Sequence, residues 1–332
     1  MNHRYTIRDI ARISGFSFKT VSRVINDEPS VKPSTREKIL QVIAETNFKP
    51  NMYAKNLNTK VNKNILVSIR KTQGQNTTQW FDYLMSFMIK EARDKQYMLI
   101  QEIIRDDADL QNSMLEKSGG YIDVLVLFYV DDHDKRIEMA QRNHIPYISF
   151  EKNPLAPISI TNNNRLGMTQ AAEFLFARGL TTICLLLGAA IDLNLDRAEA
   201  IKEVYKLHNI PLDRLEVIYN MNNLENIKRF VDRRIEDNRL PDVYFVSGDE
   251  KAIAVYNSVY AHGLSIPQDV SVMGFDNIPI SKYYYPPLTT MGQDFERLAS
   301  EMFIVIERLI GQEQDIQPVK VDPQLIIRES VK

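Results

Sequence analysis

The sequence is poor in cysteine and has no long apolar run. Cys184 is the single cysteine among 332 residues, so no disulfide can form within the chain, which favours a reducing compartment. Purely apolar runs, such as residues 124–130, fall far short of the roughly 18 residues that a membrane span needs. The first residues interleave Arg and Asp with apolar side chains, unlike a signal peptide. We therefore expect a cytoplasmic protein with no membrane association.

Residue patterns typical of catalysis are also missing. The five histidines are scattered without metal-ligand spacing, and the sequence contains neither a P-loop nor a G-x-G-x-x-G motif. Cys184 lies in an apolar run, where a thiol is expected to be an inert part of the core. The sequence therefore predicts no enzyme activity, no metal and no cofactor.

Charge is divided unevenly along the chain. Residues 1–63 hold 12 Lys and Arg against 5 Asp and Glu, a net charge of +7, whereas the remaining residues carry −9. A small basic segment on a large acidic body suggests that the segment contacts a polyanion such as nucleic acid. An ordinary basic surface is the alternative.

The basic segment has the pattern of three short helices. Residues 6–9 and 34–37 both match the capping box, which places helix starts near residues 7 and 35. Gly15 ends the first helix, and Ser17 can cap a second helix that runs to about Asn26. A small shared apolar core is expected from Ile10, Val21, Val24, Ile39, Ile43 and Phe48.

Beyond residue 64 the sequence alternates between strand and helix patterns. The predicted strands are 64–69, 97–104, 123–129, 145–150, 182–187, 215–219, 243–247 and 270–275. Such alternation predicts an α/β fold with parallel sheets, and the even division of strands favours two doubly wound lobes. Ligands of such folds bind beyond the carboxyl ends of the strands, here in the cleft between the lobes. Residues 49–63 are polar and contain Pro50, which suggests a linker able to become helical.

The basic segment resembles the DNA-binding region of the LacI/GalR family of bacterial transcriptional repressors. The resemblance covers residues 6–57 and includes the blocks TVSRVIN, STREKI and PN..A..L. Weaker resemblance extends through GMTQAAEFLFARG, SGDEKAIAVYNSV, IPQDVSVMGFDN and YPPLTTMGQDF. It implies an all-α helix-turn-helix domain, a hinge helix and a two-lobed core like that of periplasmic sugar-binding proteins.

The expected domain boundaries follow from this resemblance. The helix-turn-helix domain covers residues 1–49, the hinge helix and linker 50–63, and the effector-binding and dimerisation core 64–332. Within the core, the first lobe comprises about 64–162 and 293–319, and the second about 163–292 and 320–332.

Side chains along the second helix are the candidates for reading DNA. Lys19 and Arg23 share one helix face and can donate to guanine, while Phe18 can cover a thymine methyl group. Phe18 and Lys19 occupy positions that resemble the specificity pair of the family. A solvated basic face is the alternative. Short neutral side chains are expected to hold phosphate oxygens or to cap helices, namely Thr6, Ser17, Thr20, Ser22 and Asn26.

The hinge carries a different contact. Leu57 lies in a polar stretch without an obvious local core. The resemblance implies that it is a wedge inserted into the minor groove, with Lys55 alongside. Packing of Leu57 on the body is the alternative.

The cleft of the core is expected to bind a small polar molecule. Trp80 follows the first strand and is either an aromatic platform for a sugar or a core residue. The resemblance implies that Arg197 grips the ligand and that Asp276 accepts its hydroxyl hydrogens, although Asp276 is alternatively a cap. Glu151, Asp249 and Phe295 are expected as neighbours in the cleft.

These features predict a homodimeric, sequence-specific repressor of carbohydrate-metabolism genes. Its partners are double-stranded operator DNA and an effector, a sugar or sugar phosphate. Where the family usually has Asn followed by Asp, this chain has Gly248 and Asp249, and the missing amide leaves a second hypothesis open. In that alternative the core senses a partner protein instead of a sugar.

Overall fold

The structure is a computed structural model that describes residues 5–25, 28–48, 62–71, 79–117 and 120–332. The chain divides into two compact units between Lys63 and Asn64. We refer to residues 5–48 as the head and to residues 64–332 as the core.

Three helices form the head: α1 (Ile7–Ser14), α2 (Phe18–Ile25) and α3 (Pro33–Glu45). The capping box predicted at α1 is present, because Thr6 and Asp9 exchange hydrogen bonds, and Gly15 ends the helix with a φ of 72°. The prediction of a second capping box at residues 34–37 is wrong. The α3 helix begins two residues earlier than expected, at Pro33, whose fixed φ suits the first turn, and its N-cap Lys32 makes no side-chain cap.

The head has a small apolar core of the expected composition. Its fully or largely buried members are Ile10, Val21, Val24, Ile39 and Phe48, and Ile43 packs against them at its edge. Since Val21 and Val24 lie on one face of α2, the opposite face of that helix points away from the head core.

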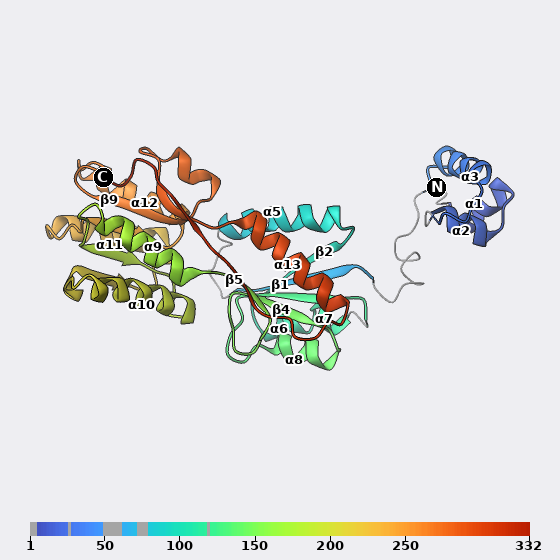
Figure 1. The fold of residues 1–332 in the computed structure, drawn as a ribbon, viewed down its shortest axis with the longest axis horizontal. Helices are drawn as coiled ribbons and strands as arrows, with labels where there is room; N and C mark the ends of the chain where they lie inside the picture. The colour runs from blue at the N-terminus through green and yellow to red at the C-terminus, as the bar shows by residue number, and fades with distance from the viewer. Residues whose placement is uncertain (1–4, 26–27, 49–61, 72–78, 118–119) are drawn as a thin grey trace. The chain divides into compact units, whose positions relative to one another are not determined.

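The first sheet of the core has six strands among the described residues. Its order is β11 (Val319–Val321), β5 (Ser159–Asn162), β4 (Tyr147–Phe150), β3 (Val124–Phe128), β1 (Asn64–Arg70) and β2 (Met98–Ile104), and all neighbours are parallel. The helices of this first lobe are α5 (Gln79–Asp94), α6 (Asp107–Leu110), α7 (Met114–Lys117), α8 (Lys135–Arg142) and α13 (Phe295–Ile310). Figure 1 shows α5 and α13 side by side.

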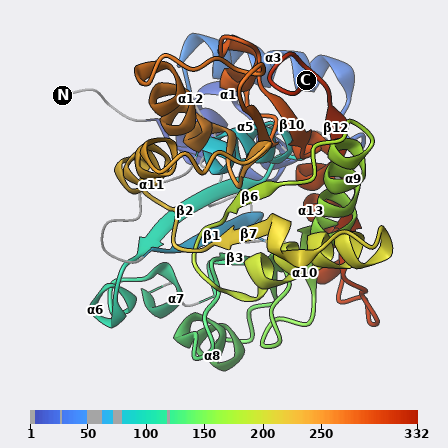
Figure 2. The ribbon, with the colours of Figure 1, turned by 90° about the vertical axis from the view of Figure 1, so that its left-hand side faces the viewer.

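The second sheet also has six strands in the described part of the chain. Its order is β12 (Gln324–Ile326), β10 (Thr289–Gly292), β9 (Ser271–Asp276), β8 (Val243–Val246), β6 (Ile183–Leu186) and β7 (Leu215–Ile218). The β10–β12 pair is antiparallel and the others are parallel. Its helices are α9 (Asn164–Phe176), α10 (Asp192–Leu207), α11 (Leu224–Glu236) and α12 (Ala252–Ala261), and Figure 2 shows them around this second lobe.

Both sheets are buried on two faces, as parallel sheets usually are. In β1, Ile65 and Val67 pack with residues of α5 and α13, whereas Leu66 joins the cluster on the opposite face. In β6, Leu185 packs with residues of α9 and α10, whereas Cys184 lies with residues of α11 and α12. Burial raises the pKa of the Cys184 thiol to about 12, which keeps it protonated and inert.

The chain passes between the sheets three times. It leaves the first sheet after Asn162, returns after Gly292 and crosses again after Val321. The third crossing was expected after residue 319, but β11 extends the first lobe to Val321. One side chain also crosses between the lobes, because Ile278 of the second lobe packs into the cluster between the first sheet, α5 and α13.

The eight predicted strands are all present. The structure adds β5, β10, β11 and β12, which the sequence did not reveal. The β11 and β12 strands have only three residues each, and β5 (SITN) and β10 (TTMG) each contain a single large apolar residue.

Candidate functional site

The outward face of α2 is the first candidate site. Phe18, at the first position of the helix, leaves 53% of its surface exposed, which is unusual for a large aromatic side chain. Lys19 beside it is exposed, and Ser22 is half-buried. An exposed aromatic next to a cation at the start of a helix can provide both an apolar and a hydrogen-bonding contact to base edges.

Arg23 has a partner within the head. Its Nε lies 3.4 Å from Glu28 Oε2, and both side chains are nearly half exposed. Such solvent-exposed ion pairs contribute little to stability, about 0–1 kcal/mol. The guanidinium can therefore exchange Glu28 for a phosphate or a base at little cost.

Two of the predicted phosphate contacts, Thr6 and Ser17, are helix caps. Thr6 Oγ1 accepts a hydrogen bond from Asp9 N at 3.3 Å and donates to Asp9 Oδ2 at 2.7 Å. Ser17 Oγ accepts from Thr20 N at 3.2 Å and lies 2.9 Å from Thr20 Oγ1. Because these hydroxyls already have partners, phosphate contacts from them would compete with the caps and stay predictions. Asn26, Lys55 and Leu57 lie outside the described residues.

The second candidate site lies at the carboxyl ends of the strands of the core. Glu151 directly follows β4, and Asp276 is the last residue of β9. Their φ angles are 69° and 120°. A positive φ is uncommon for residues other than glycine, and such conformations cluster at functional sites.

Arg197 of the second lobe is connected to Glu151 of the first lobe through the side chain of Asn164. Its Nε and Nη2 donate to Asn164 Oδ1 at 2.9 and 2.7 Å, and Nη1 donates to Ser247 Oγ at 2.6 Å. The guanidinium carbon lies 4.2 Å from the centroid of the Phe275 ring. Asn164 in turn donates to Glu151 Oε2 at 3.3 Å. The sequence did not single out Asn164 as a site residue.

Burial dominates the titration of these groups. It lowers the pKa of the Arg197 guanidinium, an effect that the Asp276 and Glu151 carboxylates oppose. It raises the pKa of Glu151, which hydrogen bonds from Thr161 and Asn164 oppose. Each charge is thus costly unless an opposite charge or a hydrogen-bond donor accompanies it.

Asp276 belongs to a second hydrogen-bonded connection between the lobes. Gln293 Nε2 donates to Asp276 Oδ1, and Gln293 Oε1 accepts from Asn162 Nδ2. Burial, followed by the nearby Glu250 carboxylate, raises the pKa of Asp276 to about 7, while Arg197 acts in the opposite direction. Neither Gln293 nor Asn162 was predicted, because their roles depend on how the crossings between the sheets lie in space.

Trp80 belongs to an aromatic cluster beside the carboxyl ends of β3 and β4. Its ring stacks on Phe150 with centroids 5.5 Å apart, and Tyr129 lies edge-on at 6.3 Å. Trp80 is half-buried and Tyr129 is exposed. The indole therefore packs against the core while keeping some accessible surface, and its role as a sugar platform stays a prediction.

Two expected cleft residues lie in the interior instead. Asp249 is fully buried, with Oδ1 accepting from Thr290 Oγ1 at 2.6 Å and Oδ2 from Ile278 N at 3.1 Å. Phe295 is almost fully buried in the first lobe and lies edge-on to Tyr83. Their roles as neighbours of a ligand in the cleft stay predictions.

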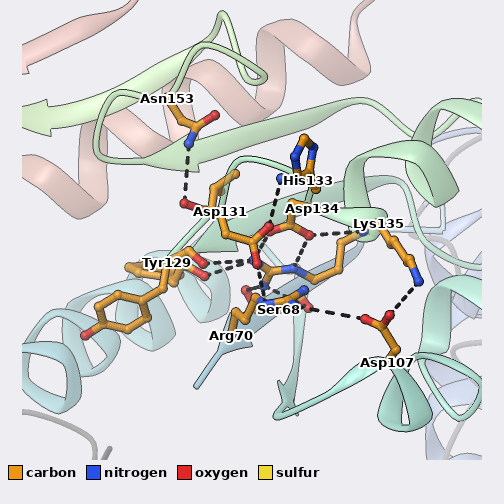
Figure 3. Close-up of polar contacts among 12 residues, drawn as sticks. Ser68, Arg70, Asp107, Tyr129, Asp131, His133, Asp134, Lys135 and Asn153 are labelled. Atoms are coloured by element: carbon orange, nitrogen blue, oxygen red, sulfur yellow. Dashed lines mark hydrogen bonds and ion pairs between the residues drawn. The ribbon is translucent and has the colours of Figure 1, made fainter. Parts of the chain in front are cut away.

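A buried ion pair supports the loop after β3 (Figure 3). Arg136 and Asp134 are fully buried, and their Nη2 and Oδ2 atoms lie 2.6 Å apart. Arg136 also donates to Ser68 O at 2.8 Å and to Phe128 O at 3.2 Å. These bonds satisfy carbonyl groups near the ends of β1 and β3, which holds the strand ends next to the aromatic cluster.

Neither a metal cluster nor a membrane span emerges from the described residues. No group of three or more His, Cys, Asp or Glu side chains in that part of the chain could hold a metal ion. None of the helices over the same ranges combines the length and apolar character needed to cross a membrane.

Comparison with known proteins identifies the class. Residues 6–51 match the model of bacterial regulatory proteins of the lacI family, and residues 172–331 match a periplasmic binding protein-like domain. The chain is therefore a helix-turn-helix regulator with a periplasmic-binding-protein-like core. It belongs to the lacI family of bacterial regulatory proteins.

The relatives are similar over nearly their whole length. The HTH-type transcriptional repressor PurR of Vibrio vulnificus (strain CMCP6) is 27% identical over 335 residues, covering 98% of both chains. The ribose operon repressor of Haemophilus influenzae is 26% identical, again over 98% of both chains. The fold matches the crystal structure of the Lac repressor dimer bound to operator and the anti-inducer ONPF, with a TM-score of 0.83, 22% identity and 99% coverage of both chains.

Proposed function

We propose that the chain is a sequence-specific repressor that binds double-stranded operator DNA as a homodimer. The observation that carries this proposal is the exposed start of α2, where Phe18 and Lys19 are exposed while Val21 and Val24 of the same helix are buried in the head core. A recognition helix needs this arrangement, since its first turns must reach base edges while its other face packs in the head.

In this proposal an effector in the cleft controls DNA binding. Arg197, Asn164 and Glu151 form a hydrogen-bonded group from both lobes at the carboxyl ends of strands, where ligands of doubly wound folds bind. The relatives named as repressors, including one of a ribose operon, support a sugar or sugar phosphate as the effector and carbohydrate-metabolism genes as the targets. A coupling of about 1–3 kcal/mol would change operator affinity roughly 5- to 150-fold.

The DNA-binding proposal is tested by selecting preferred duplexes from a random pool. We expect a pseudo-palindromic site whose binding weakens steeply with salt, with a log–log slope near −5 if about six phosphates are neutralised. Lys19→Ala should relax specificity, losing about 1–3 kcal/mol on the selected site. Lys38→Ala removes the same charge from an exposed position of α3 and is the matched control. Indifference of the wild-type chain to every duplex at low salt would overturn the proposal.

The effector proposal is tested by calorimetry of the full chain against sugars and sugar phosphates. Heat of binding for one compound, together with a change in operator affinity on its addition, is expected. Silence across the panel would favour a core that senses a partner protein.

A further inference from the structure

Two buried oxygen atoms at the lobe junction have no hydrogen-bond partner. They are Asn162 Oδ1, at the end of β5, and Glu250 Oε2, just after β8. Asn162 is almost fully buried, with 3% of its surface exposed. Since buried polar atoms are nearly always paired, two unpaired acceptors close to Asp276 point to donors supplied by a bound molecule.

The position of Glu250 depends on Gly248. A Cβ atom added at Gly248 would lie 3.1 Å from Glu250 Oε1 and 3.3 Å from Oε2, and the φ of Gly248 is 118°. The carboxylate therefore occupies the space where a side chain at residue 248 would begin. It lies near enough to Asp276 to raise the pKa of that group.

The direction of the hydrogen bonds at Asn162 follows from Asp276. Gln293 presents its NH2 group to Asp276 and its oxygen to Asn162, and above pH 7, where Asp276 is ionised and can only accept, this orientation is required. Asn162 then uses its own NH2 group on Gln293, which leaves Oδ1 as the free acceptor. The amide orientations are thereby fixed by the network.

Two cations of the junction, Arg197 and Lys251, already have partners among the described residues. The three guanidinium nitrogens of Arg197 donate to Asn164 and Ser247. Lys251 Nζ donates to Ser247 O at 3.0 Å and lies near the Glu250 and Asp276 carboxylates. An added phosphate or carboxylate would bring only acceptors and a further negative charge to this group.

We propose that the effector is an uncharged, hydroxyl-bearing molecule that donates hydrogen bonds to Glu250 Oε2 and Asn162 Oδ1. Phosphorylated or carboxylate-bearing counterparts are rejected. This inference rests on the proposed function, since it specifies the ligand of the same cleft. Glu250 becomes a specificity-determining residue, because its position over Gly248 places a carboxylate oxygen without a partner at the junction.

Matched ligand pairs test the proposal on the full chain by calorimetry at pH 8. The probes are D-ribose and D-ribose 5-phosphate, D-xylulose and D-xylulose 5-phosphate, and D-glucose and D-glucuronate. We expect that a neutral member binds at least tenfold more tightly than its anionic counterpart. Tighter binding of an anionic member overturns this inference but leaves the proposed function standing. If none of the six compounds binds, the inference is wrong. If no compound of the wider panel of sugars and sugar phosphates binds either, the proposed control by a small molecule is wrong as well.

A variant pair tests the role of Glu250. Glu250→Gln keeps the shape of the side chain but removes the charge, so we expect about tenfold weaker binding of the neutral probe. Glu225→Gln is the control, because Glu225 is exposed on α11. Glu250→Asp, which withdraws the carboxylate from Gly248, should weaken binding similarly and serves as a second variant if the first does not fold. Unchanged affinity in a folded Glu250 variant contradicts the proposal.

Discussion

The carboxylate of Asp249 occupies the space directly above Gly274. A Cβ atom added at Gly274 would lie only 2.2 Å from Asp249 Oδ1 and 2.8 Å from Leu288 Cδ2. That same carboxylate holds Thr290 and the backbone of Ile278, so glycine at residue 274 is what allows two buried hydrogen bonds to form.

Gly274→Ala should therefore destabilise the core strongly. The added methyl group overpacks the site and displaces a buried hydrogen-bonded carboxylate, so we expect a loss of about 3 kcal/mol in the free energy of unfolding. Chemical denaturation measures it. Gly311→Ala, at the exposed end of α13, is the control and should change stability by less than about 1 kcal/mol. Equal effects of the two substitutions would show that the Asp249 carboxylate is not held as described.

Glu28→Gln should strengthen DNA binding. The substitution removes a carboxylate that pairs with Arg23 and one negative charge from the head, so less competition opposes phosphate contacts. We expect a severalfold gain in affinity for both selected and random duplexes at low salt, measured by fluorescence anisotropy. Glu37→Gln removes an equal charge from an exposed position of α3. If Glu37→Gln produces the same gain, Arg23 plays no special part.

The buried ion pair at Arg136 should matter far more than its exposed neighbour. Arg136→Met leaves Asp134 charged and unpaired in the interior, at an expected cost of about 3–5 kcal/mol. Lys135→Met breaks an ion pair with Asp107 in which both side chains are more than half exposed, so it should leave the stability almost unchanged. Thermal unfolding of the two variants provides the comparison. A mild effect of Arg136→Met would mean that Asp134 is neutralised in another way.

Asp276 should make the stability of the core depend on pH. Its pKa is about 7 in the folded chain and near 3.8 when exposed, so between these values the folded state retains a proton that the unfolded state has lost. Stability attributable to this group therefore falls as pH rises from about 4 to about 7 and remains low above that range.

Asp276→Asn lacks this dependence. Relative to the wild type, the variant should gain stability progressively from pH 4 to pH 7, by at most about 4 kcal/mol. Denaturation at pH 5 and pH 8 measures the difference, with the exposed Asp213→Asn as control. A gain that is the same at both pH values would show that Asp276 does not titrate in this range.

The sequence predicted what is encoded locally. The strands β1, β3 and β6 could be predicted because they are continuous apolar runs, buried on both faces of their sheets. The capping-box residues Thr6 and Asp9 predicted where α1 begins. The second capping box failed because Pro33 starts α3 before Ser34 can cap it. Local patterns are thus informative until a stronger neighbouring signal overrides them.

The candidate site was predicted less completely, for a physical reason. Arg197 and Asp276 were expected from their motifs, and they lie at the lobe junction, but Asn164 and Gln293 connect them to the first lobe through contacts between residues far apart in the chain. Neither amide has a local signal that distinguishes it from an exposed polar residue. Asp249 differs from these amides, because its motif predicted a position close to the site but did not predict that its side chain is fully buried.

Ile278 limits how the two lobes can move relative to each other. Its side chain is packed among residues of the first lobe, while its backbone N–H is bonded to Asp249 of the second. A rotation between the lobes must either carry this isoleucine along or withdraw it from a close-packed site, and intermediate positions would leave a void. Reorientation of the lobes should therefore be a two-state transition between well-packed arrangements, and not a continuous deformation of the core.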